Sequence, residues 1–229
     1  MRTYLELVND VLIAIRDDTV TSVSYNPYAA LIASFVNDAK QQVEDAHNWS
    51  ANLVELQVSA LAAAADPDKV SLVGSNNSIA IDYAMNLTNN GGLLIQRSRR
   101  FMQIEGLRNN IAAGVVSNWC NNGVDANGDA VIQISPAPSA DTTLVFVGWQ
   151  RRPDLVDSSD VLVLPSRPVR DLAIALAVRE RGEVQGNTSQ EYFQIAKRTL
   201  SDAIAYDSAR NDEESDWKAE PILGGSYRR

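Results

Sequence analysis

The sequence predicts an α+β protein: a helical bundle built from N- and C-terminal helices, with an inserted antiparallel β domain and an extended C-terminal tail. Near both ends of the chain, apolar residues recur at spacings of three and four, which is typical of amphipathic helices. The middle consists of short β-rich runs separated by turn sequences. The end, DEESDWKAEPILGGSYRR, has too little apolar surface to fold alone. The expected boundaries are 1–50 with 164–212, then 51–163, then 213–229.

Two helices are expected in the first 50 residues. The first covers about 2–16, where Leu5, Val8 and other apolar residues form one stripe. The second follows Asn26, whose side chain is suited to capping, and Pro27, which is suited to the first helical position. It is expected to reach about Trp49.

Two more helices are expected after the β-rich middle. One begins at Ser166 or Arg167, just before Pro168, and stops at Gly182. The other begins at Thr188, which has the spacing of a capping box with Glu191, and extends to about Arg210. Four such stripes together can close a bundle core.

The middle of the chain is expected to form antiparallel strands. The runs are LVELQV, KVSLV, SIAIDYA, GGLLIQ, AVIQI and TTLVFVGW. They are separated by turn-forming segments rich in Gly, Asn, Asp and Pro. The segment RNNIAAGVVSNW is ambiguous between helix and strand, and we favour an irregular or short helical piece near 108–114.

Composition excludes several classes of function. A net charge of -9 and a pI near 4.6 disfavour a surface that wraps nucleic acid, because affinity for phosphates comes from Lys and Arg. The single cysteine, Cys120, excludes an intramolecular disulfide framework and is interpreted as a small packed side chain. The N-terminus lacks the apolar run of a signal peptide, and no stretch has the roughly 20 apolar residues of a membrane span.

Residues that carry chemistry are few. His47 is the only histidine and is interpreted as packed or solvated. Asp125, Asn127 and Asp129 resemble the start of a calcium loop. However, Ala130 replaces the expected glycine and Pro136 the expected bidentate acid, so a hairpin loop is favoured. The sequence therefore predicts no enzyme activity, no metal and no cofactor.

Two stretches resemble the adaptor, or head-to-tail connector, proteins of tailed bacteriophages. One is VIQISPAPSADTTLVFVGWQRRPDLVDSSDVLVLPSRPVRDLAIALAV, and the other is the opening YLELVNDVLIAI with a second helix ending in HNWS. The second stretch is similar to the tubular-tail adaptors of short-tailed phages. The resemblance covers most of the chain up to about residue 210.

This resemblance implies a structural virion protein without a catalytic centre. It implies a 12-subunit ring that joins the portal protein to the nozzle or next tail component, with DNA passing through its lumen without specific binding. It implies assembly in the host cytoplasm, a place in the neck of the virion, and no membrane contact. It also implies that the tail docks on the portal, through Trp217, Ile222, Leu223, Tyr227, Arg228 and Arg229.

Basic residues are grouped in two places within the β-rich middle. They are Arg97, Arg99 and Arg100, and the pair Arg151 and Arg152. Such groups can line a solvated strand face. In an acidic chain they are also suited to contact acidic neighbouring copies, so we expect them at subunit contacts.

A function of a different class stays open at this level. A stand-alone module that binds glycans or a host surface would use Trp119 and Trp149 as stacking platforms. An aromatic content of 7% without a clustered aromatic face makes this second to the adaptor, and an enzyme comes third.

Overall fold

The computed structural model describes residues 1–229 except 77, 89–91, 108–111, 182–186 and 211–229, and except the side chains of 106–107 and 187–189. The chain divides into two compact units. The helical unit contains Met1–Ala51 and the chain from Pro153 onward, and the β unit contains Asn52–Arg152. Each unit has its own hydrophobic cluster.

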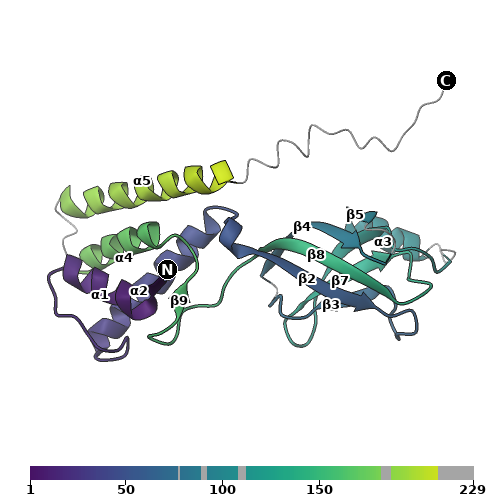
Figure 1. The fold of residues 1–229 in the computed structure, drawn as a ribbon, viewed down its shortest axis with the longest axis horizontal. Coiled ribbons are helices and arrows are strands. Elements are labelled where there is room, and N and C mark those ends of the chain that lie inside the picture. The colour runs from purple at the N-terminus through teal and green to yellow at the C-terminus, as the bar shows by residue number, and fades with distance from the viewer. Residues whose placement is uncertain (77, 89–91, 108–111, 182–186, 211–229) are drawn as a thin grey trace, which may run out of the picture. The chain divides into compact units, whose positions relative to one another are not determined.

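The helical unit contains four α-helices among its described residues (Figure 1). They are α1 (Tyr4–Ala14), α2 (Pro27–Asp45), α4 (Ser166–Glu180) and α5 (Asn187–Arg210). Helix α4 contacts the other three, so it is the central element of this unit. Strand β1 (Arg2–Thr3) pairs antiparallel with β9 (Val161–Leu162), which fixes the start of α1 beside the chain that leads into α4.

Capping fixes the start of α1 and α2. The Asn26 side chain accepts a hydrogen bond from the Ala29 N–H at 2.6 Å, and Pro27 follows at the first helical position, as the sequence predicts. Thr3 and Glu6 form a capping box, so α1 begins at Tyr4 rather than at residue 2. The predicted capping box at Thr188 falls outside the described side chains.

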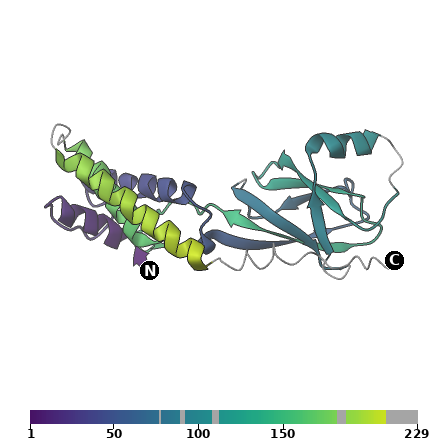
Figure 2. The same ribbon diagram turned by 90° about the horizontal axis from the view of Figure 1, so that it is seen from above.

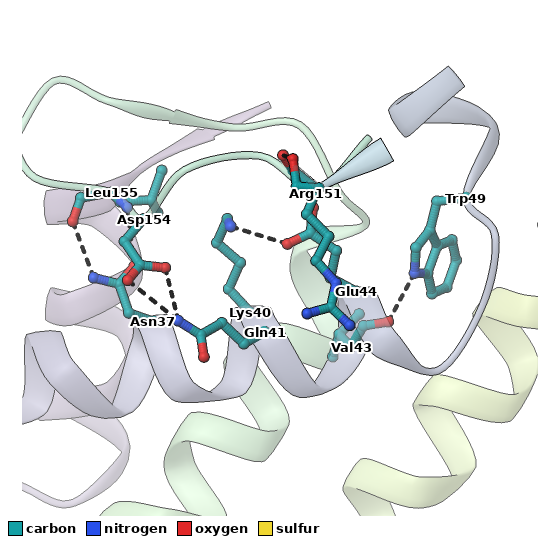
Figure 3. A network of polar contacts seen from close by, with 10 residues as sticks. Asn37, Lys40, Gln41, Val43, Glu44, Trp49, Arg151, Asp154 and Leu155 are labelled. Atoms are coloured by element: carbon teal, nitrogen blue, oxygen red, sulfur yellow. Dashed lines mark hydrogen bonds and ion pairs between the residues drawn. The ribbon is translucent and has the colours of Figure 1, made fainter. Parts of the chain in front are cut away.

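Asparagine and tyrosine side chains fasten the loops of the helical unit. Asn37 donates to the Leu155 carbonyl and accepts from the Leu155 N–H, both at 3.0 Å (Figure 3). Asn9 makes the same pair of bonds with Val20. The buried Tyr4 hydroxyl donates to the Ala33 carbonyl at 2.7 Å and accepts from Asn37. Burial, together with nearby aspartates, raises the pKa of Tyr4 to about 12.

The β unit is a seven-stranded sheet in the order β2-β8-β4-β5-β6-β7-β3. Figures 1 and 2 show this sheet from two directions. Its strands are β2 (Leu53–Ala60), β3 (Lys69–Leu72), β4 (Ile79–Asn86), β5 (Gly92–Gln96), β6 (Asn118–Val124), β7 (Ala130–Ser135) and β8 (Thr142–Gln150). All neighbours pair antiparallel except β5 and β6, which are parallel. The edge strands β2 and β3 contact each other, so the sheet nearly closes around its core.

One face of every strand supplies the core of the β unit. It is formed by Leu72, Trp119, Ile132, Ile134, Leu144, Phe146 and smaller residues at alternate positions. Trp119 packs edge to face on Phe146, with ring centroids 5.8 Å apart. Helix α3 (Arg99–Leu107) contacts β6. Because side chains alternate along a strand, the remaining positions face outward.

The fold class predicted from the sequence is wrong. The structure is a mixed α+β protein dominated by a nearly closed, barrel-like seven-stranded sheet, with five α-helices among the described residues, rather than a helical bundle with a small inserted antiparallel domain. Two elements were missed. The segment 118–124 was read as ambiguous and as loop, yet it forms β6, and α3 lies where a strand face was expected. Helix α3 lies between β5 and β6 in the chain, and β6 pairs parallel with β5, which makes the sheet mixed.

A bulge in the sheet requires a glycine at position 148. The register between β4 and β8 shifts between Ile81 and Tyr83. A Cβ atom at Gly148 would lie 2.3 Å from the Ala80 carbonyl oxygen and 2.8 Å from the Ile81 Cα atom. Only a residue without a side chain allows the two backbones to approach so closely.

Candidate interaction surfaces

The first arginine group lies where β5 leads into α3. The Arg97 N–H donates to the Trp119 carbonyl at 2.8 Å, and its Nε donates to the Asn118 side chain at 3.1 Å. The guanidinium lies 5.1 Å from the centre of the Phe101 ring. These contacts hold Arg97 against β6 and α3 although its side chain is exposed.

Arg99 and Arg100 occupy the first turn of α3, and both are exposed. The N-terminal end of a helix already carries partial positive charge, so cations are less favourable there than anions. Two further guanidinium groups follow Arg97 within three residues. An anionic partner would relieve this local repulsion.

The second arginine group, Arg151 and Arg152, follows β8 directly. The Arg151 N–H donates to the Ser78 carbonyl at 3.2 Å. Strands β5 and β8 both pair antiparallel with β4, so they run in the same direction on either side of it. Leu94 pairs with Ala84, whereas Gln150 pairs with Ile79, so the two arginine groups follow their strands at different levels along β4.

His47 belongs to a polar cluster at the ends of α2 and α5. Its Nε2 atom lies 3.3 Å from an Asp207 carboxylate oxygen, and its ring packs edge to face on Trp49. Asp207 also accepts from the Ser50 N–H at 2.9 Å and from the Ser50 hydroxyl at 2.5 Å. The carboxylate stands between serine and histidine, so the hydroxyl donates to the carboxylate and no nucleophile–base pair forms. The cluster ties α5 to the segment after α2.

A groove of about 510 Å³ lies beside this cluster. Its walls come from Trp49–Ala51, from the segment Val163–Pro168 at the start of α4, and from the last turns of α5. Polar groups in the walls include Asp202, Asp207 and Arg210. The groove is mainly apolar, and these groups do not form an acid–base or nucleophilic arrangement.

The calcium-like stretch is a hairpin loop, as the sequence predicts. The Asp125 carboxylate accepts from the N–H groups of Asn127 and Asp129, and the bond from Asp129 is the main cause of its lowered pKa. Asp129 accepts from the Gly74 and Asn76 N–H groups. Both carboxylates are therefore occupied by the backbone. The described part of the chain contains no group of three His, Cys, Asp or Glu side chains placed to hold a metal ion.

The remaining side chains singled out in the sequence have structural surroundings. Cys120 is buried and has a free thiol, as expected of a small packed residue. Burial raises the pKa of this thiol, and the charge of Arg99 opposes that effect. Trp119 is 1% exposed, which removes one of the two stacking platforms that a glycan-binding module would need. Trp149 is partly exposed on β8.

The six tail residues expected to bind the portal, from Trp217 to Arg229, lie outside the described residues. Among the helices that the structure describes, none is long and apolar enough to cross a bilayer. The model of one protein family, the SU10 adaptor protein, matches residues 2–219. The chain belongs to the SU10 adaptor protein family.

Family membership confirms the resemblance to bacteriophage adaptors noted in the sequence. This SU10 adaptor family protein is a structural component of a phage virion, and its role is to contact other head or tail components. The match includes both units, so it covers the arginine groups as well as the helices. No curated protein matches the chain.

Proposed function

We propose that this adaptor forms a ring that joins the portal to the nozzle or next tail component and contributes part of the channel through which DNA leaves the capsid. The family match across residues 2–219 carries this proposal. The charge of -9 supports it, because a channel wall with excess carboxylates repels DNA and lets it slide. A ring of 12 subunits is the stoichiometry that we propose.

The absence of a reaction centre among the described residues is compatible with this function but is not evidence for it. The clearest polar cluster, around Asp207, satisfies backbone and hydroxyl donors and fastens α5 to the rest of the helical unit. An adaptor depends on rigid units with complementary surfaces rather than on activated side chains. The two independent cores provide such units.

The direct test is association with the portal protein of the same genome. The purified chain, the portal and their mixture are compared by light scattering, and complexes are imaged by negative staining. We expect a ring of adaptor subunits on the portal, with a mass increase that corresponds to 12 chains of 25.0 kDa. If the assembled portal binds no adaptor, the proposed function is wrong.

We further propose that the tail supplies the portal contact through Trp217, Ile222, Leu223, Tyr227, Arg228 and Arg229. Aromatic residues and arginine often dominate binding energy at interfaces. Deleting 213–229 should leave the circular dichroism spectrum and thermal unfolding unchanged while portal binding is lost. A truncated chain that still binds the portal would remove these residues from the contact without affecting the wider adaptor proposal.

The arginine groups are proposed to contact neighbouring subunits, and Arg99 and Arg100 provide the sharpest test. The double variant Arg99→Glu/Arg100→Glu should assemble poorly, because it reverses the charge of the first turn of α3. The double variant Lys197→Glu/Arg198→Glu is the matched control, since it reverses two adjacent exposed cations on α5. Equal ring yields from the two variants would argue against the proposed contact.

A further inference from the structure

An apolar sector covers part of the outer face of the β unit. It comprises Tyr83 and Met85 on β4 and Leu93 and Ile95 on β5, and its β8 side is formed by Val145 and Val147, which are only 3% and 8% exposed. Met85 is directly opposite both Leu93 and Val145, and Tyr83 is opposite Val147. The neighbouring core positions Ala84, Leu94 and Phe146 point inward, so these six residues point outward.

This sector differs from the rest of the outer face. On β2 the outward positions include Glu55, Gln57 and Ser59, which are exposed. On β7 and β3 they include Gln133 and Ser71. An antiparallel sheet with one solvated face normally shows such polar residues outward. Three adjacent strands break this pattern, so the sector has the composition of a covered surface.

The sector is exposed on β4 and β5, and exposed apolar side chains also lie on α3. Tyr83 is 40%, Leu93 41% and Ile95 53% exposed, which is high for large apolar residues grouped together. Phe101 lies beside the Arg97 guanidinium, and Ile104 follows one helical turn later. Both are about 40% exposed. The apolar surface therefore extends up to the first arginine group.

Charge indicates what kind of surface fits this sector. Residues 52–152 contain eight acidic and seven basic residues, whereas the rest of the chain contains 21 acidic and 13 basic residues. The β unit is thus almost neutral, and its apolar sector is bordered by Arg97, Arg99 and Arg100. The acidic excess lies almost entirely in the other part of the sequence. A second copy of the chain therefore offers the acidic complement to this arginine border.

We propose that the apolar sector is the surface on which a second copy of this chain docks, with Arg97, Arg99 and Arg100 steering the acidic surface of that copy into place. This inference rests on the proposed ring, because it names the face that joins neighbouring subunits. Apolar contact in the middle of an interface supplies most of the affinity, and charges at its border contribute orientation and rate.

Photo-crosslinking at position 93 tests the proposal directly. Leu93 is replaced with p-benzoylphenylalanine in the full chain, and Val73, which is 79% exposed and lies outside the sector, is replaced in the control. Each protein is irradiated alone at high concentration and after mixing with the portal. We expect an adduct with twice the mass of the 25.0 kDa chain from position 93 and none from position 73.

Other outcomes overturn the proposal. An adduct only with the portal, a crosslink within one chain, or no chain-to-chain adduct in either sample would each mean that another occupant, or none, covers the sector. Equal chain-to-chain adducts at positions 93 and 73 would show non-specific contact. The chain irradiated alone reports on the docking face, and the mixture with the portal reports on the portal interaction. Failure of one proposal can therefore be distinguished from failure of the other.

A charged double variant provides a second measurement. Leu93→Asp/Ile95→Asp changes two exposed positions, so the β unit should fold, which circular dichroism checks. We expect self-association to weaken at least about tenfold, which corresponds to about 1.4 kcal/mol of binding free energy, because two carboxylates would replace apolar side chains within the contact. Val73→Asp should associate like the unaltered chain. Unchanged association of the double variant would refute the assignment.

Discussion

Gly148 is the position at which the smallest substitution should have the largest effect on the β unit. Changing Gly148→Ala adds one carbon atom, whose position is 2.3 Å from the Ala80 carbonyl oxygen, 2.8 Å from the Ile81 Cα and 2.9 Å from the Ala80 carbonyl carbon. All three neighbours are backbone atoms of β4. They cannot rotate away as a side chain would, so the strands themselves must separate.

The size of the effect follows from this geometry. An ordinary contact needs about 3.4 Å, so β4 and β8 must move apart by about 1 Å beside the bulge at Ile81–Tyr83. Overpacking a well-filled core costs about 1–3 kcal/mol. Weakening one ladder hydrogen bond adds about 1 kcal/mol. We expect Gly148→Ala to lower the free energy of unfolding of the β unit by about 2–4 kcal/mol.

Urea unfolding measures this change, followed by circular dichroism and tryptophan fluorescence because the two units can unfold separately. With a urea dependence of about 2 kcal/mol/M, the midpoint should fall by about 1–2 M. Gly114→Ala is the matched control, since among the described atoms its Cβ would meet the Pro136 side chain at 3.4 Å and the Ala112 carbonyl oxygen at 3.8 Å. If Gly148→Ala unfolds within about 0.5 kcal/mol of the unaltered chain, the steric argument is refuted.

The helical unit provides three further predictions. Asn26→Ala should lower the free energy of unfolding, measured by thermal unfolding, by about 1 kcal/mol because the Ala29 N–H loses its cap. Asn26→Ser should retain most of the stability, so an equal loss of stability in both variants would contradict the capping argument. Asp207→Ala should lower the urea midpoint by more than Asp207→Asn does, because only alanine leaves both Ser50 donors without an acceptor. Burial raises the pKa of Tyr4 to about 12, so as the pH rises the unfolded chain loses the Tyr4 proton at a lower pH than the folded chain does. The contribution of Tyr4 to the free energy of unfolding should therefore be fully present below pH 10 and decrease between pH 10 and 12. Tyr4→Phe should remove this pH dependence, and it should also remove the tyrosinate absorbance step that occurs at the highest pH.

Local sequence signals predicted the individual elements better than the fold class. The cap at Asn26 and Pro27, the stripe of α1 and most strand runs follow from interactions within a few residues. Strand β6 was missed because NWCNNGV lacks the apolar alternation of a strand. It is held by pairing with β7 on one side and, through Ile95 and Gln96, with the distant strand β5 on the other. Helix α3 was missed because its polar first turn, Arg99–Arg100, resembled an exposed strand face.

The interaction surfaces show the same division. The arginine groups were recognisable as isolated positive charge in an acidic chain, but only the structure shows that one group lies at the start of α3 and the other at the end of β8. The apolar sector was not recognisable at all. Val145, Val147 and their neighbours belong to strands that read as continuously apolar, and a run of this kind does not show which face is inside.

The sequence by itself determined the absence of a recognised catalytic motif, the acidic balance of the chain, the helices at both ends, and the resemblance to phage adaptors that the family match confirms. These features follow from composition and from patterns among residues that are close together in the chain. Only the tertiary structure decided that the sheet nearly closes, that it includes a parallel pair, and that three adjacent strands carry an apolar outer face. The physical reason is that strand pairing is non-local: hydrogen bonds between distant segments select the order and register, and the register decides which side of each strand is buried.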